Sequence, residues 1–216
     1  MAKNEITAQD VLYVLEQMCS DLEAKREELR QLDAQIGDGD LGITIELGCR
    51  SLREGLPALK DADIGTILGR SGMNFTKAAA STFGILMASL LMGAGKPVMK
   101  QNAIGLADLA KVAEGAEQGV RNRGKADVGD KTMLDALVPA VKAIASAAEG
   151  GKSIPDALDA AVKAAEEGMK STIPMQSRQG RARWQQERTI GVQDAGATAI
   201  YYMVESCARH LKGRLA

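Results

Sequence analysis

The sequence predicts an all-α protein that folds as a single domain over residues 1–216, from about eight amphipathic helices. Apolar residues recur at intervals of three and four along most of the chain, which is the period of a helix with one buried face. The alternation of β-branched and polar residues that marks strands is nearly absent. No linker rich in Pro or Ser divides the 216 residues, a length that one domain commonly spans.

The first helix is expected over residues 7–32, where Val11, Leu15, Met18 and Leu22 share one face and charged residues fill the other. Six further segments have the same period, and the glycine-bearing stretches between them suit short connections between helices. Only 3% of residues are aromatic and Ala and Gly are abundant, so we expect closely packed helices with the ten methionines mainly in the core. The six segments are 44–54, 64–92 with an internal break, 104–121, 132–149, 154–170 and 193–211.

The composition excludes several classes of function. Lys and Arg total 27 against 28 Asp and Glu, so no strong field attracts nucleic acid or an anionic membrane. The longest apolar stretch, residues 83–92, is too short to cross a bilayer, and the charged first residues do not resemble a signal peptide. The three cysteines lack the spacing of a zinc site or a disulfide framework, so we expect a cytoplasmic protein. A single histidine, His210, leaves little for a histidine-based triad or metal site.

The strongest chemical signal lies in residues 32–44, where Asp33, Asp38 and Asp40 stand among three glycines. Ionised carboxylates this close repel one another, and hard oxygen ligands on a tight turn suit one or two Mg²⁺ ions. The glycines permit positive φ and leave backbone amides open to a phosphate at the start of the next helix. The alternative is a solvated turn in which Asp40 caps that helix. A calcium-binding EF-hand is excluded, because its loop beginning at Asp38 would end on Cys49 where a glutamate is required.

Two later stretches add weaker signals. Residues 121–137 form a glycine-bearing loop followed by a helix start, with Asp130 or Thr132 as the expected cap. The sequence contains neither a P-loop nor a dinucleotide-binding motif, so a nucleotide site here is of another kind. Residues 180–199 gather three arginines around the only tryptophan. Arginines grip phosphate oxygens, so this stretch suits a lid over a ligand, with a charged surface loop as the alternative.

In their order along the chain, these segments resemble the Dak2 domain family, the ADP-binding L subunit of dihydroxyacetone kinase. The resemblance spans nearly the whole chain. It implies an antiparallel barrel of eight amphipathic helices that holds a nucleotide and two Mg²⁺ ions at one end. The motifs that carry it are Gly-Asp-Gly-Asp-Leu-Gly at 37–42, Ala-Ser at 80–81, Gly-Asp-Lys-Thr-Met-Leu-Asp-Ala-Leu at 129–137, Glu-Arg-Thr-Ile-Gly at 187–191 and Asp-Ala-Gly at 194–196.

The resemblance also implies roles for single residues. Asp33, Asp38 and Asp40 would be the metal ligands that bridge to the phosphates. Arg181 would close over the nucleotide and take part in catalysis. The nucleotide contacts that the resemblance implies are Leu41, Gly42, Ile43, Thr44, Ala80, Ser81, Gly124, Met133, Arg181, Asp194, Ala195 and Gly196.

Three positions depart from the family pattern. Many members have His at the position of Leu41, Gly at that of Thr82 and Pro at that of Ala195. The first change removes a polar contact near the nucleotide, and the second fills space that Gly leaves open for a close backbone approach. These changes bear on nucleotide affinity and on the choice between ADP and ATP.

The implied activity is that of a phosphotransferase, the nucleotide-binding subunit of a ketose kinase. Such a subunit carries a phosphoryl group on Mg-bound ADP or ATP to a small ketose, dihydroxyacetone or a relative such as erythrulose, held on a histidine of a separate K subunit. The phosphoryl donor is either ATP or a third subunit, M, of a phosphotransferase system, and a homodimer is left open. The alternatives are a stand-alone Mg-dependent phosphatase, a regulator that binds a transcription factor through its nucleotide end, and a purely structural helical protein.

Overall fold

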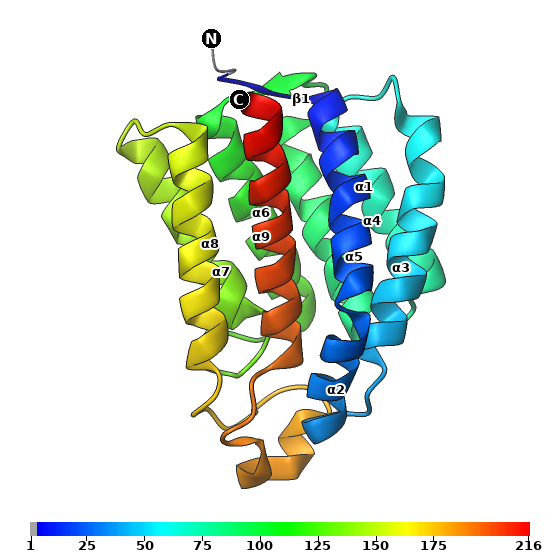
Figure 1. The fold of residues 1–216 in the computed structure, drawn as a ribbon, viewed down its shortest axis with the longest axis vertical. Helices are drawn as coiled ribbons and strands as arrows, with labels where there is room; N and C mark the ends of the chain where they lie inside the picture. Colours follow the sequence, from blue (N-terminus) through cyan, green and yellow to red (C-terminus); the bar gives the residue numbers. More distant parts are fainter. Residues whose placement is uncertain (1–3) are drawn as a thin grey trace.

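The computed structural model describes residues 4–216, and these residues form nine α-helices, three short 3-10 helices and one pair of two-residue strands (Figure 1). The strands β1 (Ile6–Thr7) and β2 (Ala103–Ile104) pair antiparallel. The 3-10 helices are η1 (Leu56–Leu59), η2 (Lys96–Val98) and η3 (Ala182–Thr189). The α-helices are α1 (Ala8–Ala24), α2 (Arg26–Ile36), α3 (Leu41–Gly55), α4 (Ile64–Ala78), α5 (Thr82–Gly95), α6 (Leu106–Gly124), α7 (Leu134–Glu149), α8 (Ile154–Ser171) and α9 (Ala195–Leu215).

Eight of these helices form a closed ring. Along the chain from α3 to α9 each helix packs against the next, and α1 packs against both α3 and α9. Neighbouring helices of the ring are antiparallel, and most of the connections between them are short. The prediction of an all-α antiparallel barrel of eight helices is therefore confirmed, with α2 as a ninth, shorter helix below the ring. None of the helices among residues 4–216 is both long enough and apolar enough to cross a membrane.

The up-and-down order of the ring brings alternate connections to one end. The segments 37–40, 79–81, 125–133 and 172–194 all lie at the end opposite the two termini (Figure 1). Helices α3, α5, α7 and α9 begin at this end, and α4, α6 and α8 finish there. The sequence motifs thus lie on connections, or on the first turns of the helices that follow them, which the topology places together although they are far apart in the chain.

Several helix boundaries differ from the predicted ones. The first predicted helix is two helices, because the chain turns at Lys25 (φ −94°, ψ 1°). Thr7 precedes α1 as its cap and belongs to β1: its Oγ1 accepts from the Asp10 amide, and the Asp10 carboxylate accepts from the Thr7 amide at 3.0 Å. The predicted break within 64–92 falls at 79–81, and α3 begins at Leu41, ahead of the predicted residue 44.

The core confirms close helix packing and corrects the expectation for methionine. A Cβ on Gly93 of α5 would lie 2.2 Å from the Gly115 carbonyl oxygen of α6, so the two backbones are nearly in contact. Among residues 4–216, five methionines are buried, whereas Met73, Met92 and Met99 are exposed. The buried ones are Met18, Met87, Met133, Met169 and Met203.

Candidate functional site

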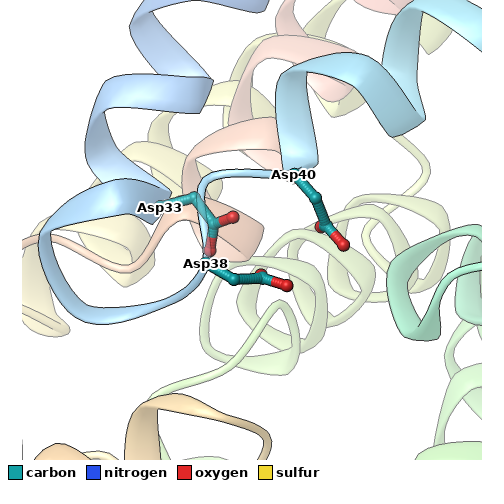
Figure 2. Close-up of side chains that lie close together, drawn as sticks. All are labelled: Asp33, Asp38 and Asp40. Carbon is teal, nitrogen blue, oxygen red and sulfur yellow. The ribbon is translucent and has the colours of Figure 1, made fainter.

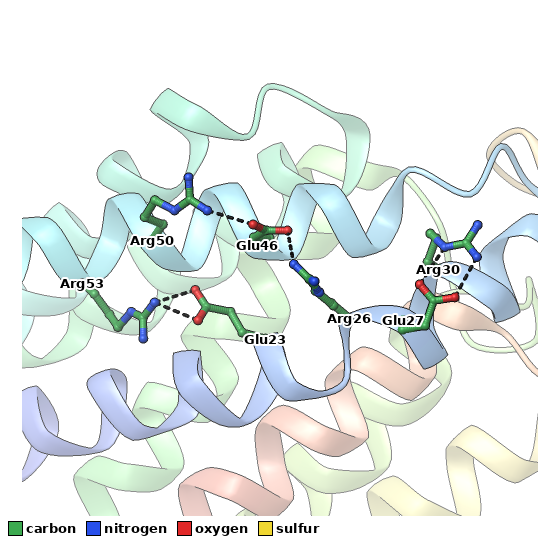
Figure 3. Close-up of polar contacts among 7 residues, drawn as sticks. All are labelled: Glu23, Arg26, Glu27, Arg30, Glu46, Arg50 and Arg53. Atoms are coloured by element: carbon green, nitrogen blue, oxygen red, sulfur yellow. Dashed lines mark hydrogen bonds and ion pairs between the residues drawn. The ribbon is translucent and has the colours of Figure 1, made fainter.

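Helix α2 brings the first aspartate to the site, and polar contacts fix its position. Arg26 of α2 pairs with Glu46 of α3 at 2.7 Å, and Arg50 reaches the same carboxylate at 2.8 Å (Figure 3). On the other side, the Tyr202 hydroxyl of α9 donates to Glu28. A single exposed ion pair contributes only about 0–1 kcal/mol. Together these contacts nevertheless tie α2 to both of its neighbours and so orient Asp33 near its end.

The turn from α2 to α3 is built by its glycines. Gly39 has φ +72°, a conformation that glycine adopts without strain. Gly42 lies so close to α2 that a Cβ there would be 2.4 Å from the Arg26 carbonyl oxygen. The Leu41 amide donates to Asp33 Oδ2 at 3.2 Å, so the end of α2 is joined to the start of α3. The turn therefore holds the aspartates before and after it in a fixed relation.

Figure 2 shows Asp33, Asp38 and Asp40 converging on one region of space. Each offers a carboxylate oxygen, and these oxygens lie within 4.8 Å of one another. Burial and the nearby Asp33 carboxylate raise the pKa of Asp40. Asp40 stands at the N-cap position of α3, but its side chain makes no capping hydrogen bond. The interpretation of this segment as a turn capped by Asp40 is therefore wrong, and the Asp40 carboxylate is available to a cation.

A cation already faces this cluster in the structure. The Arg181 guanidinium, which comes from the long connection between α8 and α9, pairs with Asp38 and lies 3.5 Å from Asp40. The donor atoms of the cluster are carboxylate oxygens, and Mg²⁺ in proteins is held by one or two carboxylates together with waters and phosphate oxygens. The residues present therefore fit a magnesium site.

Beside the aspartates lies a cavity of about 400 Å³. It is bordered by the first residues of four helices: Leu41 of α3, Thr82 of α5, Leu134 of α7 and Ala195 of α9. Helix N-termini carry partial positive charge and unpaired amides, and they bind anions such as phosphate. Much of the cavity lining is apolar, which suits a flat aromatic ring. The larger apolar side chains that line it include Ile36, Phe83, Ile85, Leu86, Val120 and Met133.

Side chains partly satisfy the amides at these helix starts. Ser81 Oγ accepts from the Gly84 amide at 3.1 Å and also from the Thr44 hydroxyl at 3.1 Å. Asp194 Oδ1 accepts from the Ala197 amide at 2.7 Å. Burial raises the pKa of Asp194 to about 7, although that hydrogen bond lowers it.

The comparisons with known proteins agree with this geometry. Residues 35–209 match the family described as the DAK2 domain. The chain belongs to the DAK2 domain family. It is 38% identical over 191 residues to the ADP-binding subunit DhaL of the PEP-dependent dihydroxyacetone kinase of Escherichia coli, covering 88% of this chain and 91% of that protein. It is 33% identical over 202 residues to the ADP-binding subunit DhaL of PEP-dependent dihydroxyacetone kinase 2 of Listeria innocua, covering 93% of each.

Longer kinases contain this DAK2 domain as one part. The crystal structure of the C. freundii dihydroxyacetone kinase with AMP-PNP and Mg²⁺ superposes with a TM-score of 0.70 at 26% identity. The match covers 92% of this chain and 33% of that one, so the chain spans about a third of the longer kinase. These relatives are kinases by name, which makes the DAK2 chain a member of a phosphotransferase family.

Most of the residues that the family resemblance implied lie at the cavity of this DAK2 domain. Four do not border it. Gly42 packs against α2, Ile43 is 57% exposed, Thr44 is buried and bonded to Ser81, and Ala80 is exposed before Ser81. The residues that do border it are Asp33, Asp38, Asp40, Leu41, Ser81, Gly124, Met133, Arg181, Asp194, Ala195 and Gly196.

Part of the cavity lining is not predicted by the sequence. Most of its larger apolar residues lie outside the motifs, and a helical apolar residue has the same pattern in the sequence whether it faces the core or a ligand. The N-cap position of α7 is Met133, not Asp130 or Thr132, although Thr132 Oγ1 does accept from the Leu134 amide at 3.2 Å. The buried Asp135 carboxylate accepts from the Gly129 and Thr132 amides at 2.6 and 2.7 Å. The polar lining residues that were missed are Thr82, Arg123, Lys131, Thr132 and Gln179.

Proposed function

We propose that this chain is the nucleotide-binding, phosphoryl-carrying subunit of a kinase for dihydroxyacetone or a related small ketose. The observation that carries the proposal is the convergence of three carboxylates and four helix N-termini on one cavity. Carboxylates attract divalent cations and helix N-termini attract phosphate, so the two together suit a nucleotide bound with magnesium. The match to subunits named as ADP-binding supports the same proposal.

In this proposal Asp33, Asp38 and Asp40 hold two Mg²⁺ ions, which offset the charge of the phosphates and of the group in transfer. The helix starts at Leu41, Thr82 and Ala195 direct their partial positive charge at the phosphates, and the apolar residues that line the cavity, Val120 and Met133 among them, receive the base. The similar C. freundii kinase was crystallised with AMP-PNP and Mg²⁺, and that ligand pair supports the proposal.

Arg181 is the residue that we propose for catalysis. Its guanidinium lies against Asp38 and Asp40. A cation at that place stabilises negative charge on phosphate oxygens and helps exclude water, which favours transfer over hydrolysis. Gly124, Met133 and Gly196 border the nucleotide around it.

The ketose is proposed to sit on a separate K subunit. The only histidine of the chain, His210, lies on α9 fifteen residues after Ala195, or about 22 Å along the helix axis from the cavity, and contacts Asp21 at 3.0 Å. It cannot hold a ketose at the cavity. The phosphoryl donor is either ATP or an M subunit of a phosphotransferase system.

Isothermal titration calorimetry with ADP in the presence of Mg²⁺ tests the site. Asp38→Ala is expected to weaken ADP binding by more than about 100-fold, because outer-sphere partners of a metal ligand alone account for about 10–100-fold. Asp61→Ala is the matched control, since Asp61 is 87% exposed and lies at the opposite end of the ring. Equal ADP affinity in Asp38→Ala and the wild type, or a wild type that binds neither ADP nor ATP, would overturn the proposal.

A second experiment tests the division of labour. With ATP, Mg²⁺ and dihydroxyacetone, the isolated chain is expected to form no dihydroxyacetone phosphate, and addition of a K subunit is expected to start the reaction. Product formed by the chain alone would contradict the proposed role. The nucleotide content of the purified chain, measured after release by acid, distinguishes the two possible phosphoryl donors. ADP that co-purifies with the chain indicates a protein donor, and an empty site indicates exchangeable ATP.

A further inference from the structure

The connection between α8 and α9 is fixed at its base by one buried lysine from another loop. We call residues 175–192 the lid. The Lys131 ammonium donates to three lid carbonyl oxygens: that of Met175 at 3.0 Å, that of Thr189 at 2.5 Å and that of Val192 at 2.6 Å. These acceptors come from both ends of the lid. Lys131 is only 2% exposed, which is rare for a lysine.

The chemistry of this contact indicates what Lys131 does. An ammonium group has three hydrogens to donate, and here all three go to backbone carbonyls of the lid. Although Lys131 borders the cavity, it has no donor left for a phosphate oxygen in this arrangement. Burial lowers the pKa of Lys131, and the negative charge of Asp194 opposes that shift. The three carbonyls compensate the cost of burying the ammonium group.

The loop that carries Lys131 is itself rigidly built. Lys131 has φ +60°, a conformation that side chains other than glycine adopt only where their surroundings hold them. The buried Asp135 carboxylate holds Lys131 in this conformation, because it accepts from the Gly129 amide before Lys131 and from the Thr132 amide after it. The ammonium group is therefore presented from a fixed point on the ring.

Further hydrogen bonds close the base of the lid. The Ser177 amide donates to Thr189 Oγ1 at 2.9 Å, the Arg178 amide to the Asp130 carbonyl at 3.1 Å, and the Gly191 amide to the Ile173 carbonyl at 2.8 Å. Beyond this base, residues 179–188 project from the ring toward the aspartates. They carry Arg181 and the chain's only tryptophan, Trp184, which is 75% exposed.

We propose that Lys131 is a positioning residue, which holds the base of the lid so that Arg181 lies over Asp38 and Asp40. The expected effect of Lys131 on nucleotide binding rests on the proposed function, whereas its effect on the lid is independent of any ligand. If the lid is closed in only a fraction of molecules, apparent affinity falls by that fraction. If loss of the three lid contacts lowers the fraction of closed molecules to about a tenth, ADP binding is therefore expected to weaken about tenfold.

The test is a double-mutant cycle on ADP affinity with Mg²⁺ present, using Lys131→Met and Arg181→Ala. Each single variant is expected to weaken binding by about tenfold or more. Because Lys131 acts through Arg181, the double variant is expected to bind no more weakly than Arg181→Ala alone. Lys163→Met, which removes an exposed lysine of α8, is the matched control and keeps wild-type affinity.

Fluorescence of Trp184 gives a readout that simple loss of stability does not move. In fully folded Lys131→Met without ligand, the time-resolved anisotropy is expected to gain a fast component that is absent from the wild type and from Lys163→Met. Unchanged anisotropy, or an additive loss of affinity in the double variant, would overturn the inference. A third outcome separates the two proposals. If the wild type binds neither ADP nor ATP, but Trp184 gains the fast component in Lys131→Met, the proposed function is refuted and the role of Lys131 in holding the lid is supported.

If Lys131→Met does not fold, Thr189→Val opens the same base from the other side. Thr189 Oγ1 accepts from the Ser177 amide and donates to the Gln186 carbonyl at 2.7 Å. The same fast anisotropy component and the same lack of additivity with Arg181→Ala are expected. A folded Thr189→Val with wild-type anisotropy would count against a lid held at this base.

Discussion

Replacement of Gly42 by alanine tests how closely the aspartates depend on helix packing. A Cβ at Gly42 would lie 2.4 Å from the Arg26 carbonyl oxygen and 3.0 Å from Arg30 Cβ. Real Cβ contacts essentially begin at 3.0 Å, so the starts of α2 and α3 must separate by about 0.6 Å. Metal ligands tolerate displacements of only about 0.2 Å. Gly42→Ala is therefore expected to move Asp33 relative to Asp40 and to weaken Mg²⁺-dependent ADP binding.

The same overlap is expected to cost stability, by about 1–3 kcal/mol as for other overpacked sites. Urea denaturation measures it. Gly69→Ala is the matched control, because Gly69 lies within α4 and a Cβ there meets nothing within 4 Å. That variant is expected to raise the free energy of unfolding by about 0.4–1 kcal/mol. If Gly42→Ala is as stable as the wild type and binds ADP as well, the packing argument for Gly42 is refuted.

The remaining predictions concern two other helix starts at the same end. Because burial raises the pKa of Asp194 to about 7 from an ordinary 3.8, the ligand-free native chain keeps a proton there that the unfolded chain releases. The free energy of unfolding is therefore expected to fall as the pH rises from about 4 to about 7. Asp194→Asn is expected to flatten this dependence, which is measured by urea denaturation at a series of pH values. The same pH dependence in the variant and the wild type would contradict the raised pKa of Asp194. Ser81→Ala removes the cap of α5 and is expected to lower the free energy of unfolding by about 1 kcal/mol, whereas Ser89→Ala, which loses only a bond to a carbonyl of its own helix, is expected to change it little.

The periodicity of the sequence predicts the ring well, because each ring helix buries one face and its period records that face. It does not predict the turn at Lys25, where neither glycine nor proline interrupts the pattern. That turn depends on partners distant in sequence. Tyr202 of α9 donates to Glu28, and its ring lies 4.7 Å from the Lys25 ammonium. Helix α2 is thus set by tertiary contacts that no local pattern contains.

The candidate site likewise has a part that the sequence predicts and a part that depends on tertiary packing. Crowded carboxylates are visible in the sequence because their repulsion is a local property, and the structure brings Asp33, Asp38 and Asp40 together. Whether a residue beside them faces the cavity depends on how the helices pack, and Ile43 turns outward for that reason. Lys131 could not be identified either. The carbonyl oxygens that accept from Lys131 lie 44 to 61 residues further along the chain, and Lys131 is buried only because the lid folds over it.

The placement of the termini has a consequence for how this domain joins other chains. Both described ends lie beyond the far end of the ring from the cavity (Figure 1), and α9 alone spans 21 residues, or about 31 Å. A segment attached at either terminus needs about ten extended residues before it reaches the mouth. Fusion partners and affinity tags therefore leave the path of the nucleotide unobstructed, and a tethered catalytic partner requires a linker at least that long.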